Sequence, residues 1–230
     1  MTAGEQTGRV VVITGATGKL GPAVAARFAA GGDRLVLVAR DRLMLDGLVS
    51  SLPGGSERHL AVDLDLLDPA GVAALPARVE ATLGRTAVLL HLMGSYSGGH
   101  PFEQSPDEEW SSLLDDNLWS TVRIVRAFLP SIRASAGGRL VTISTPLAGA
   151  PVVEIAAYAA SKAAVEAATI SVARELADTN ATANVVLVRT IGDAKRSHTR
   201  PAEVAAAIHW LCSPEAAAVN GQRIPVVGRG

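Results

Sequence analysis

Short runs of apolar residues recur along the chain, and longer segments with helical character separate them. Each run has four to six residues rich in valine, leucine and isoleucine, which is typical of strands buried on both faces. The segments between the runs carry helix signals, such as a proline near the first turn or a closing pair of glycines. This pattern predicts strands at residues 10–13, 34–39, 59–62, 87–92, 139–143, 183–188 and 223–227.

The alternation of strands and helices, without tight hairpins, predicts an α/β fold with one doubly wound parallel sheet. Right-handed crossovers would place helices on both faces of the sheet, the longest of them at residues 117–135 and 156–178. No linker, repeat or charge run divides residues 1–230, so we expect a single domain. Ligands of such sheets bind outside the carboxyl ends of the strands, and functional residues should therefore follow strands.

Composition narrows the class of protein further. The chain has 230 residues, 48% of them hydrophobic, and a formal net charge of -1, which argues against nucleic-acid binding. No apolar run approaches the ~20 residues of a membrane span. The N-terminus has no apolar signal-peptide core and Cys212 is the single cysteine, so we expect a soluble cytoplasmic protein. The five histidines are scattered, and no metal site is expected.

Three glycines, Gly15, Gly18 and Gly21, follow the first strand and lead into a small-residue helix. Glycine lets the backbone approach a phosphate closely, and a helix N-terminus offers unpaired N–H groups. The spacing differs from Gly-x-Gly-x-x-Gly, and glycines of an ordinary strand–helix turn are the alternative interpretation. The position on the first strand of an alternating chain favours an anion-binding turn.

The end of the second strand bears on the choice of cofactor. In dinucleotide-binding folds an acidic residue near this point holds the adenosine ribose, whereas an arginine accommodates a 2′-phosphate. Here Ala39 is neutral, and Arg40 and Arg42 follow it. This favours NADP(H), with NAD(H) still possible; two solvated arginines at the start of a surface helix are the alternative.

Tyr158 and Lys162 form the sharpest constellation in the sequence. Their i, i+4 spacing places both on one face of the predicted helix. A phenol with a pKa near ~10 is a poor acid or base at neutral pH. A neighbouring ammonium favours the phenolate and is expected to lower the pKa of Tyr158 toward the working range.

With these residues the chain resembles the short-chain dehydrogenase/reductase family along nearly its whole length. The resemblance implies a Rossmann fold of seven parallel strands in the order 3-2-1-4-5-6-7. It also implies hydride transfer between a nicotinamide cofactor and a small-molecule carbonyl or alcohol substrate. The matching segments are residues 14–21, Asp63, Asn117, residues 138–145, residues 158–165 and residues 219–228.

The resemblance also implies catalytic roles. Tyr158 would be the general acid for carbonyl reduction, and Lys162 would bind the nicotinamide ribose and lower the pKa of Tyr158. Asn117 would hold a water molecule through its main chain. The substrate-polarising serine of the family is replaced by Thr145, while Ser144 should point away because strands alternate faces.

The cofactor-binding residues implied by the resemblance follow several different strands. Asp63 would meet the adenine amino group, the N–H of Leu64 an adenine ring nitrogen, and the backbone of Ile191 the nicotinamide carboxamide. The full set is Gly15, Thr17, Gly18, Lys19, Leu20, Gly21, Arg40, Asp63, Leu64, Met93, Gly94, Tyr158, Lys162 and Ile191.

Four departures from the family pattern leave a second function open, that of a catalytically weak dinucleotide-binding sensor or assembly partner. They are Lys19 in the glycine turn, His91-Leu92-Met93 in place of Asn-Asn-Ala, Val188-Arg189 in place of Pro-Gly, and a shortened substrate-covering loop near 190–200; Thr145 in place of the family's serine also motivates the second function. The polar segment after Ile191 cannot form an apolar lid, so we expect an open substrate site.

The expected walls of this open site are residues 95–100 and 146–155. For Tyr96 and Trp119 we favour a role in packing over a contact with the substrate, because aromatic side chains more often serve packing. The resemblance further implies a homotetramer or homodimer formed through the two longest helices.

Overall fold

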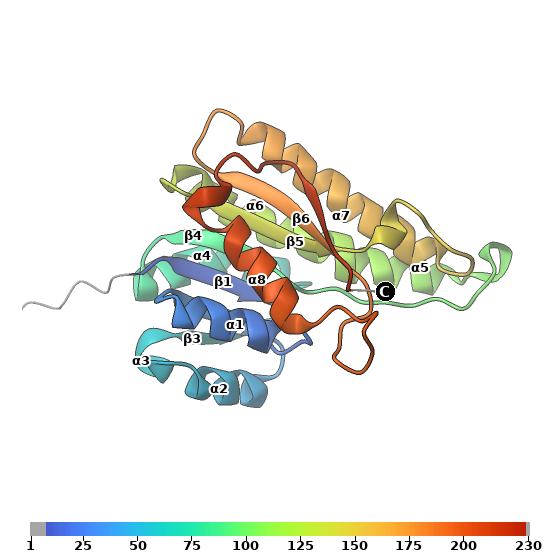
Figure 1. The fold of residues 1–230 in the computed structure, drawn as a ribbon. Helices are drawn as coiled ribbons and strands as arrows, with labels where there is room; N and C mark the ends of the chain where they lie inside the picture. The colour runs from blue at the N-terminus through green and yellow to red at the C-terminus, as the bar shows by residue number, and fades with distance from the viewer. Residues whose placement is uncertain (1–7, 229–230) are drawn as a thin grey trace, which may run out of the picture.

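The computed structural model describes residues 8–228 and contains one sheet of seven strands (Figure 1). All neighbouring strands are parallel, and their order is β3-β2-β1-β4-β5-β6-β7, which confirms the predicted topology. The strands are β1 (Val10–Thr14), β2 (Arg34–Ala39), β3 (Leu60–Asp63), β4 (Thr86–His91), β5 (Arg139–Ser144), β6 (Thr182–Val188) and β7 (Arg223–Val226).

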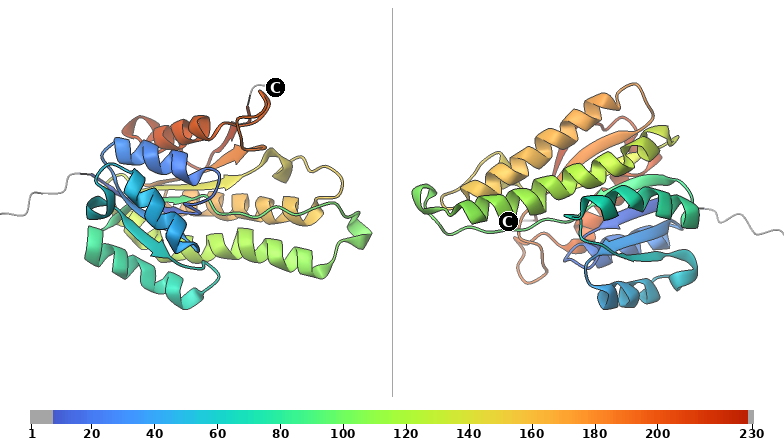
Figure 2. Two further views of the ribbon diagram at one scale, coloured as in Figure 1. Left: turned by 90° about the horizontal axis from the view of Figure 1, so that it is seen from below. Right: turned by 180° about the vertical axis from the view of Figure 1, so that it is seen from behind.

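Helices cover both faces of the sheet, as the two additional views show (Figure 2). They are α1 (Gly21–Ala30), α2 (Arg42–Ser51), α3 (Gly55–Arg58), α4 (Pro69–Leu83), α5 (Asp107–Leu113), α6 (Ser120–Ala134), α7 (Ala156–Glu175) and α8 (Pro201–Leu211). Single turns occur at η1 (Phe102–Gln104), η3 (Pro146–Ala148) and η4 (Pro214–Ala216), and η2 (Leu114–Trp119) is a π-helix.

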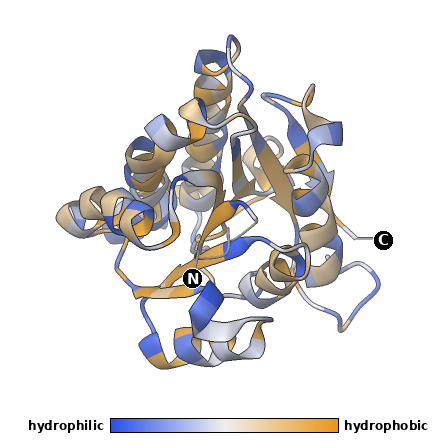
Figure 3. Ribbon diagram, turned by 90° about the vertical axis from the view of Figure 1, so that its left-hand side faces the viewer, coloured by the Kyte–Doolittle hydropathy of each residue, from blue (hydrophilic) through white to orange (hydrophobic). Residues whose placement is uncertain are grey.

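Two hydrophobic cores lie on opposite faces of the sheet, because successive strand side chains point in opposite directions. Val11 and Ile13 of β1 belong to the core under α1 and α8, whereas Val10 and Val12 belong to the core under α4, α6 and α7. The strands are accordingly the most hydrophobic part of the fold in Figure 3. This two-sided burial explains the continuous apolar runs in the sequence.

The residues predicted to begin the 117–135 helix instead belong to a longer helical run. Helix α5 continues through the π-helix η2 into α6, and Asn117 lies within η2. The hydroxyl of Thr121 donates a 2.6 Å hydrogen bond to the carbonyl of Asn117. A π-turn inserts an extra residue into a helix and changes the direction of its side chains, which is why such turns occur often at functional sites.

Candidate active site

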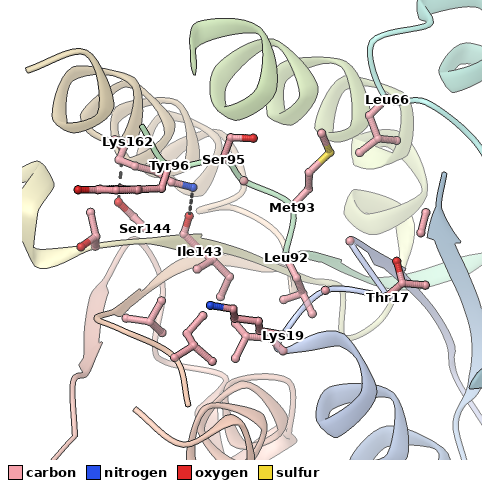
Figure 4. A pocket seen from close by; sticks show the side chains of 18 of the residues that line it. Thr17, Lys19, Leu66, Leu92, Met93, Ser95, Tyr96, Ile143, Ser144 and Lys162 are labelled. Atoms are coloured by element: carbon pink, nitrogen blue, oxygen red, sulfur yellow. Dashed lines mark hydrogen bonds between the residues drawn. The ribbon is translucent and has the colours of Figure 1, made fainter. Parts of the chain in front are cut away.

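A cleft of about 880 Å³ lies beyond the carboxyl ends of the strands (Figure 4). Residues that follow β1, β2, β3, β4, β5 and β6 line it, together with the first turns of α7. The cleft brings together most of the predicted cofactor residues: Gly15, Thr17, Gly18, Lys19, Leu20, Arg40, Leu64, Met93, Gly94, Tyr158, Lys162 and Ile191.

The glycine turn at one end of the cleft has the properties of an anion cradle. Gly15 has a φ of 69°, and a Cβ there would lie 2.8 Å from the backbone nitrogen of Met93, so only glycine fits. Within residues 8–228 no protein acceptor meets the N–H groups of Lys19 and Leu20. Figure 4 shows the Lys19 side chain extending along the cleft. Free N–H groups, a helix N-terminus and a cation together fit the phosphates of a dinucleotide.

Three predicted cofactor residues are placed differently from the expectation. Gly21 does not line the cleft; a Cβ there would lie 1.9 Å from the carbonyl oxygen of Ala16, so this glycine allows α1 to pack closely against the turn. Asp63 lies outside the cleft lining and pairs with Arg42 at 3.4 Å. The N–H of Leu64 donates to the carbonyl of Ala39 at 2.9 Å and is therefore not a free donor for an adenine ring.

The two arginines after β2 have different environments. Arg42 pairs with Asp46 at 2.9 Å and with Asp63 at 3.4 Å, and it does not line the cleft. Arg40 is exposed and lines the cleft, and no ion pair within the described chain engages it. Asp41 also lines the cleft, but its carboxylate caps α2 by accepting from the N–H of Met44 at 3.0 Å. Of these two arginines, Arg40 is thus the one whose guanidinium is available to a ligand in the cleft.

Tyr158 and Lys162 lie on the first turns of α7 and both line the cleft. Burial lowers the pKa of Lys162 to about 8, and its Nζ donates to the carbonyl of Ile143 at 3.3 Å. Burial also raises the pKa of Tyr158, against a smaller lowering by the hydrogen bond with Thr145. The expected lowering of the Tyr158 pKa by Lys162 is therefore absent from this structure, because the ammonium is bonded to a carbonyl and desolvation of the phenol dominates.

Thr145 occupies the position expected of the substrate-polarising hydroxyl. It is buried and lines the cleft, its Oγ1 accepts from the N–H of Leu147 at 3.4 Å, and its proximity to Tyr158 partly offsets the rise that burial causes in the pKa of that phenol. The preceding Ser144 was expected to point away from the site, but it also lines the cleft (Figure 4); its hydroxyl is engaged there, donating to the Glu166 carboxylate of α7 at 2.7 Å. Arg223 of β7 pairs with the same carboxylate, so this buried group links β5, α7 and β7.

The Asn117 side chain connects the β4 loop to the catalytic helix. Its Oδ1 accepts from the N–H of Ser95 at 2.9 Å, and its Nδ2 donates to the Ser95 carbonyl at 3.1 Å and to Ser161 Oγ at 2.9 Å. A Cβ on Gly94 would lie 2.5 Å from Lys162 Nζ and 3.0 Å from Asn117 Oδ1. Glycine at position 94 therefore leaves the space in which the lysine and the amide come together. The role of the Asn117 main chain in holding water stays a prediction.

His91 is a residue of the site that the sequence left without a clear partner. Its imidazole is completely buried, with Nδ1 2.7 Å from Thr14 Oγ1 and Nε2 3.4 Å from Ser120 Oγ. Burial, with the nearby Lys162 cation, lowers its pKa to about 3, so the ring is neutral. His91 thus joins β1, β4 and the start of α6. Thr14 is the last residue of β1 and His91 the last residue of β4, and the two are paired in the register of these neighbouring strands. The pairing of the two strand ends is what brings their side chains together.

The substrate end of the cleft differs in part from the expectation. Tyr96 is 67% exposed and lines the cleft, so it is not the packing residue that was favoured. Trp119 does not line the cleft and lies under the Arg123 cation at 5.9 Å. Residues 190–199 fold back on themselves: Ile191 pairs with Thr199, and Gly192 N–H donates to the Thr199 carbonyl at 3.0 Å.

Residues 8–228 lack the features of a membrane span and of a metal site. No helix there is long and apolar enough to cross a membrane. The same residues contain no cluster of His, Cys, Asp and Glu side chains that could hold a metal ion.

Comparison with known proteins identifies the class of protein that this fold and site define. The family model for short chain dehydrogenases matches residues 9–202, and the chain belongs to the short-chain dehydrogenase/reductase family. Its relatives are oxidoreductases.

Particular relatives are similar over nearly the whole chain. The 3-oxoacyl-(acyl-carrier-protein) reductase FabG of Escherichia coli is 28% identical over 96% of both chains. The monensin polyketide synthase putative ketoacyl reductase of Streptomyces virginiae is 30% identical over 97% of both chains. Among solved structures, the NADPH-bound form of a Pseudomonas aeruginosa short chain oxidoreductase with an atypical catalytic center is 28% identical. It covers 95% of both chains with a TM-score of 0.86.

Proposed function

We propose that the protein is an NADP(H)-dependent oxidoreductase that interconverts a carbonyl compound and a secondary alcohol, with Tyr158 as the general acid and base. One observation carries the proposal. The Tyr158 phenol, the Thr145 hydroxyl and the Lys162 ammonium line the same cleft as the glycine turn. The ketoacyl reductase relatives and the NADPH-bound neighbour support the same reaction class and cofactor.

The residues of the cleft fit a nicotinamide dinucleotide. Its volume of about 880 Å³ is within the usual range for cofactor sites. The glycine turn and Lys19 would hold the pyrophosphate, Arg40 the adenosine 2′-phosphate, and Lys162 the nicotinamide ribose. When bound, the cofactor supplies or accepts the hydride.

The proton chemistry belongs to the chain itself. In reduction, the hydroxyl of Tyr158 donates a proton to the carbonyl oxygen as negative charge develops there. Thr145, which also lines the cleft, donates a second hydrogen bond to the same oxygen. In oxidation, the Tyr158 phenolate accepts the proton of the alcohol.

The Lys162 ammonium would favour that phenolate only if it came free of the Ile143 carbonyl, to which it is bonded in this structure. A pKa of about 8 keeps most of the Lys162 side chains charged at pH 7. Coulomb attraction is stronger in a buried site than in water, so an ammonium at this depth would stabilise a phenolate beside it more than a solvent-exposed lysine would.

A catalytically weak dinucleotide-binding protein is the second candidate function. The observation that favours it is that burial raises the pKa of Tyr158 while Lys162 is bonded elsewhere. Such a protein would bind NADPH and respond to it without turning over a carbonyl substrate.

Two measurements separate the candidates. Fluorescence titration compares the affinities for NADPH and NADH, and tighter binding of NADPH is expected. A panel of ketones and aldehydes is then tested for NADPH oxidation by the wild-type protein and by Tyr158→Phe. Turnover that depends on Tyr158 supports the oxidoreductase, whereas NADPH binding without such turnover supports the sensor.

A further inference from the structure

Tyr96 lies at the substrate end of the cleft and has no part in the chemistry described above. Its ring lies edge-to-face with the Tyr158 ring, with centroids 4.9 Å apart and an interplanar angle of 74°. The side chain is 67% exposed, and among the residues that line the cleft these two are the aromatic ones. Packing residues are buried, so an exposed ring against the reacting phenol calls for another explanation.

The chain fixes the segment before Tyr96 firmly. Ser95 exchanges two backbone hydrogen bonds with the Asn117 side chain, at 2.9 and 3.1 Å. Its hydroxyl also donates to the Asp116 carboxylate at 2.5 Å. The residue that precedes Tyr96 is therefore attached to the π-helix at three points.

The segment after Tyr96 is fixed as well. The N–H of Gly99 donates to the Glu154 carbonyl at 2.8 Å, and a Cβ on Gly98 would lie 2.8 Å from that same oxygen. Glu154 has a φ of 64°, a conformation that non-glycine residues rarely adopt. The two loops beside the cleft are thus held together, and contacts on both sides restrain the backbone around Tyr96. Within residues 8–228 its hydroxyl has no hydrogen-bond partner.

We propose that Tyr96 is a specificity-determining residue that favours carbonyl substrates with an aromatic or conjugated planar group next to the reacting carbon. A carbonyl oxygen that accepts a proton from Tyr158 brings its substituents beside the ring in contact with Tyr158. Aromatic rings attract one another through offset or edge-to-face contacts beyond the burial of apolar area. The inference rests on the proposed function and adds a substrate class to it.

The rest of the cleft supports an aromatic contact at this position. Leu147, two residues after Thr145, adds an apolar side chain to the lining of the cleft. Residues 192–198 are polar, and the Ile191–Thr199 bridge closes this segment on itself. Tyr96 is therefore the aromatic surface that an incoming substrate meets beside Tyr158.

The test compares a phenyl ketone with an unbranched aliphatic ketone. The ratio of kcat/KM for the two ketones is measured for the wild-type protein, Tyr96→Ala and Tyr96→Phe. We expect Tyr96→Ala to lower this ratio on the order of 10-fold, mainly through KM for the phenyl ketone. Tyr96→Phe keeps the ring and should stay within about 3-fold of the wild-type ratio. Phe102→Ala is the matched control, because Phe102 is an exposed aromatic residue (70%) that does not line the cleft.

A pH profile supplies a second readout. Burial raises the pKa of Tyr158, and the neighbouring Tyr96 adds to this rise, so removal of the ring should move the profile to lower pH. An unchanged ratio in a Tyr96→Ala variant that still reduces both ketones overturns the specificity inference and leaves the proposed function standing. A wild-type protein that binds NADPH but reduces neither ketone overturns both.

Discussion

Acid should destabilise the protein through His91, because this imidazole is neutral and completely buried. Its pKa is about 3 in the folded protein, against 6.5 for an ordinary histidine. Between these two values the unfolded chain binds a proton that the folded protein excludes, so stability decreases as the pH falls below 6.5. Each pH unit in this range costs about 1.4 kcal/mol, which amounts to about 2–3 kcal/mol between pH 7 and pH 4.5.

The measurement is the free energy of unfolding in urea at pH 7 and at pH 4.5, for the wild-type protein and for His91→Asn. Asparagine offers hydrogen bonds to Thr14 and Ser120 but does not titrate. Between pH 7 and pH 4.5 the free energy of unfolding of His91→Asn should therefore fall by about 2–3 kcal/mol less than that of the wild type. At pH 7 the substitution itself should lower the free energy of unfolding by about 1–2 kcal/mol, because asparagine makes imperfect contacts in a buried site.

Other titrating groups are the same in both proteins, which is why the difference between the two losses is informative. His100→Asn is the control for a histidine-to-asparagine exchange outside the core, because the His100 side chain is 49% exposed. This control shows how much of any difference comes from the exchange itself and not from burial. Equal losses for wild type and His91→Asn would refute the reasoning that His91 is held neutral by burial.

Further predictions concern the lysine, the cofactor and the assembly. Gly94→Ala places a Cβ 2.5 Å from Lys162 Nζ and should displace the ammonium. We expect kcat to fall by about 10-fold or more, while the far-UV circular dichroism spectrum stays close to that of the wild type. Arg40→Ala should weaken NADPH binding on the order of 10-fold in a fluorescence titration and leave NADH binding nearly unchanged, because only NADPH carries the 2′-phosphate. Light scattering should give the mass of a homodimer or homotetramer, formed through α6 and α7; the mass of a single chain would contradict this.

The sequence predicted the fold because the signals for it are local or periodic. Apolar runs of four to six residues became strands of four to seven residues, and the absence of hairpin signals indicated parallel pairing. Tyr158 and Lys162 were predictable because a helix fixes the relation of residues four apart. Ser144 was expected to point away because a strand alternates its faces, but it lines the cleft together with Thr145.

The remaining features depend on contacts between distant segments. The hydrogen bond from Leu64 N–H to Ala39 follows from the pairing of β2 and β3, which a single strand cannot reveal. The position of Tyr96 depends on contacts of the β4 loop with η2 and with residues near Glu154. The raised pKa of Tyr158 reflects burial, which the i, i+4 spacing does not report.

The central claim is that the Tyr158 phenol transfers the proton while the glycine turn holds the cofactor. It is tested most directly by single-turnover reduction of a ketone with NADPH-saturated wild type and Tyr158→Phe. The account predicts NADPH affinities within about 3-fold of each other and a rate that is lower in the variant by about 10²- to 10⁴-fold. A Tyr158→Phe protein that binds NADPH and keeps more than about a tenth of the wild-type rate would contradict the account.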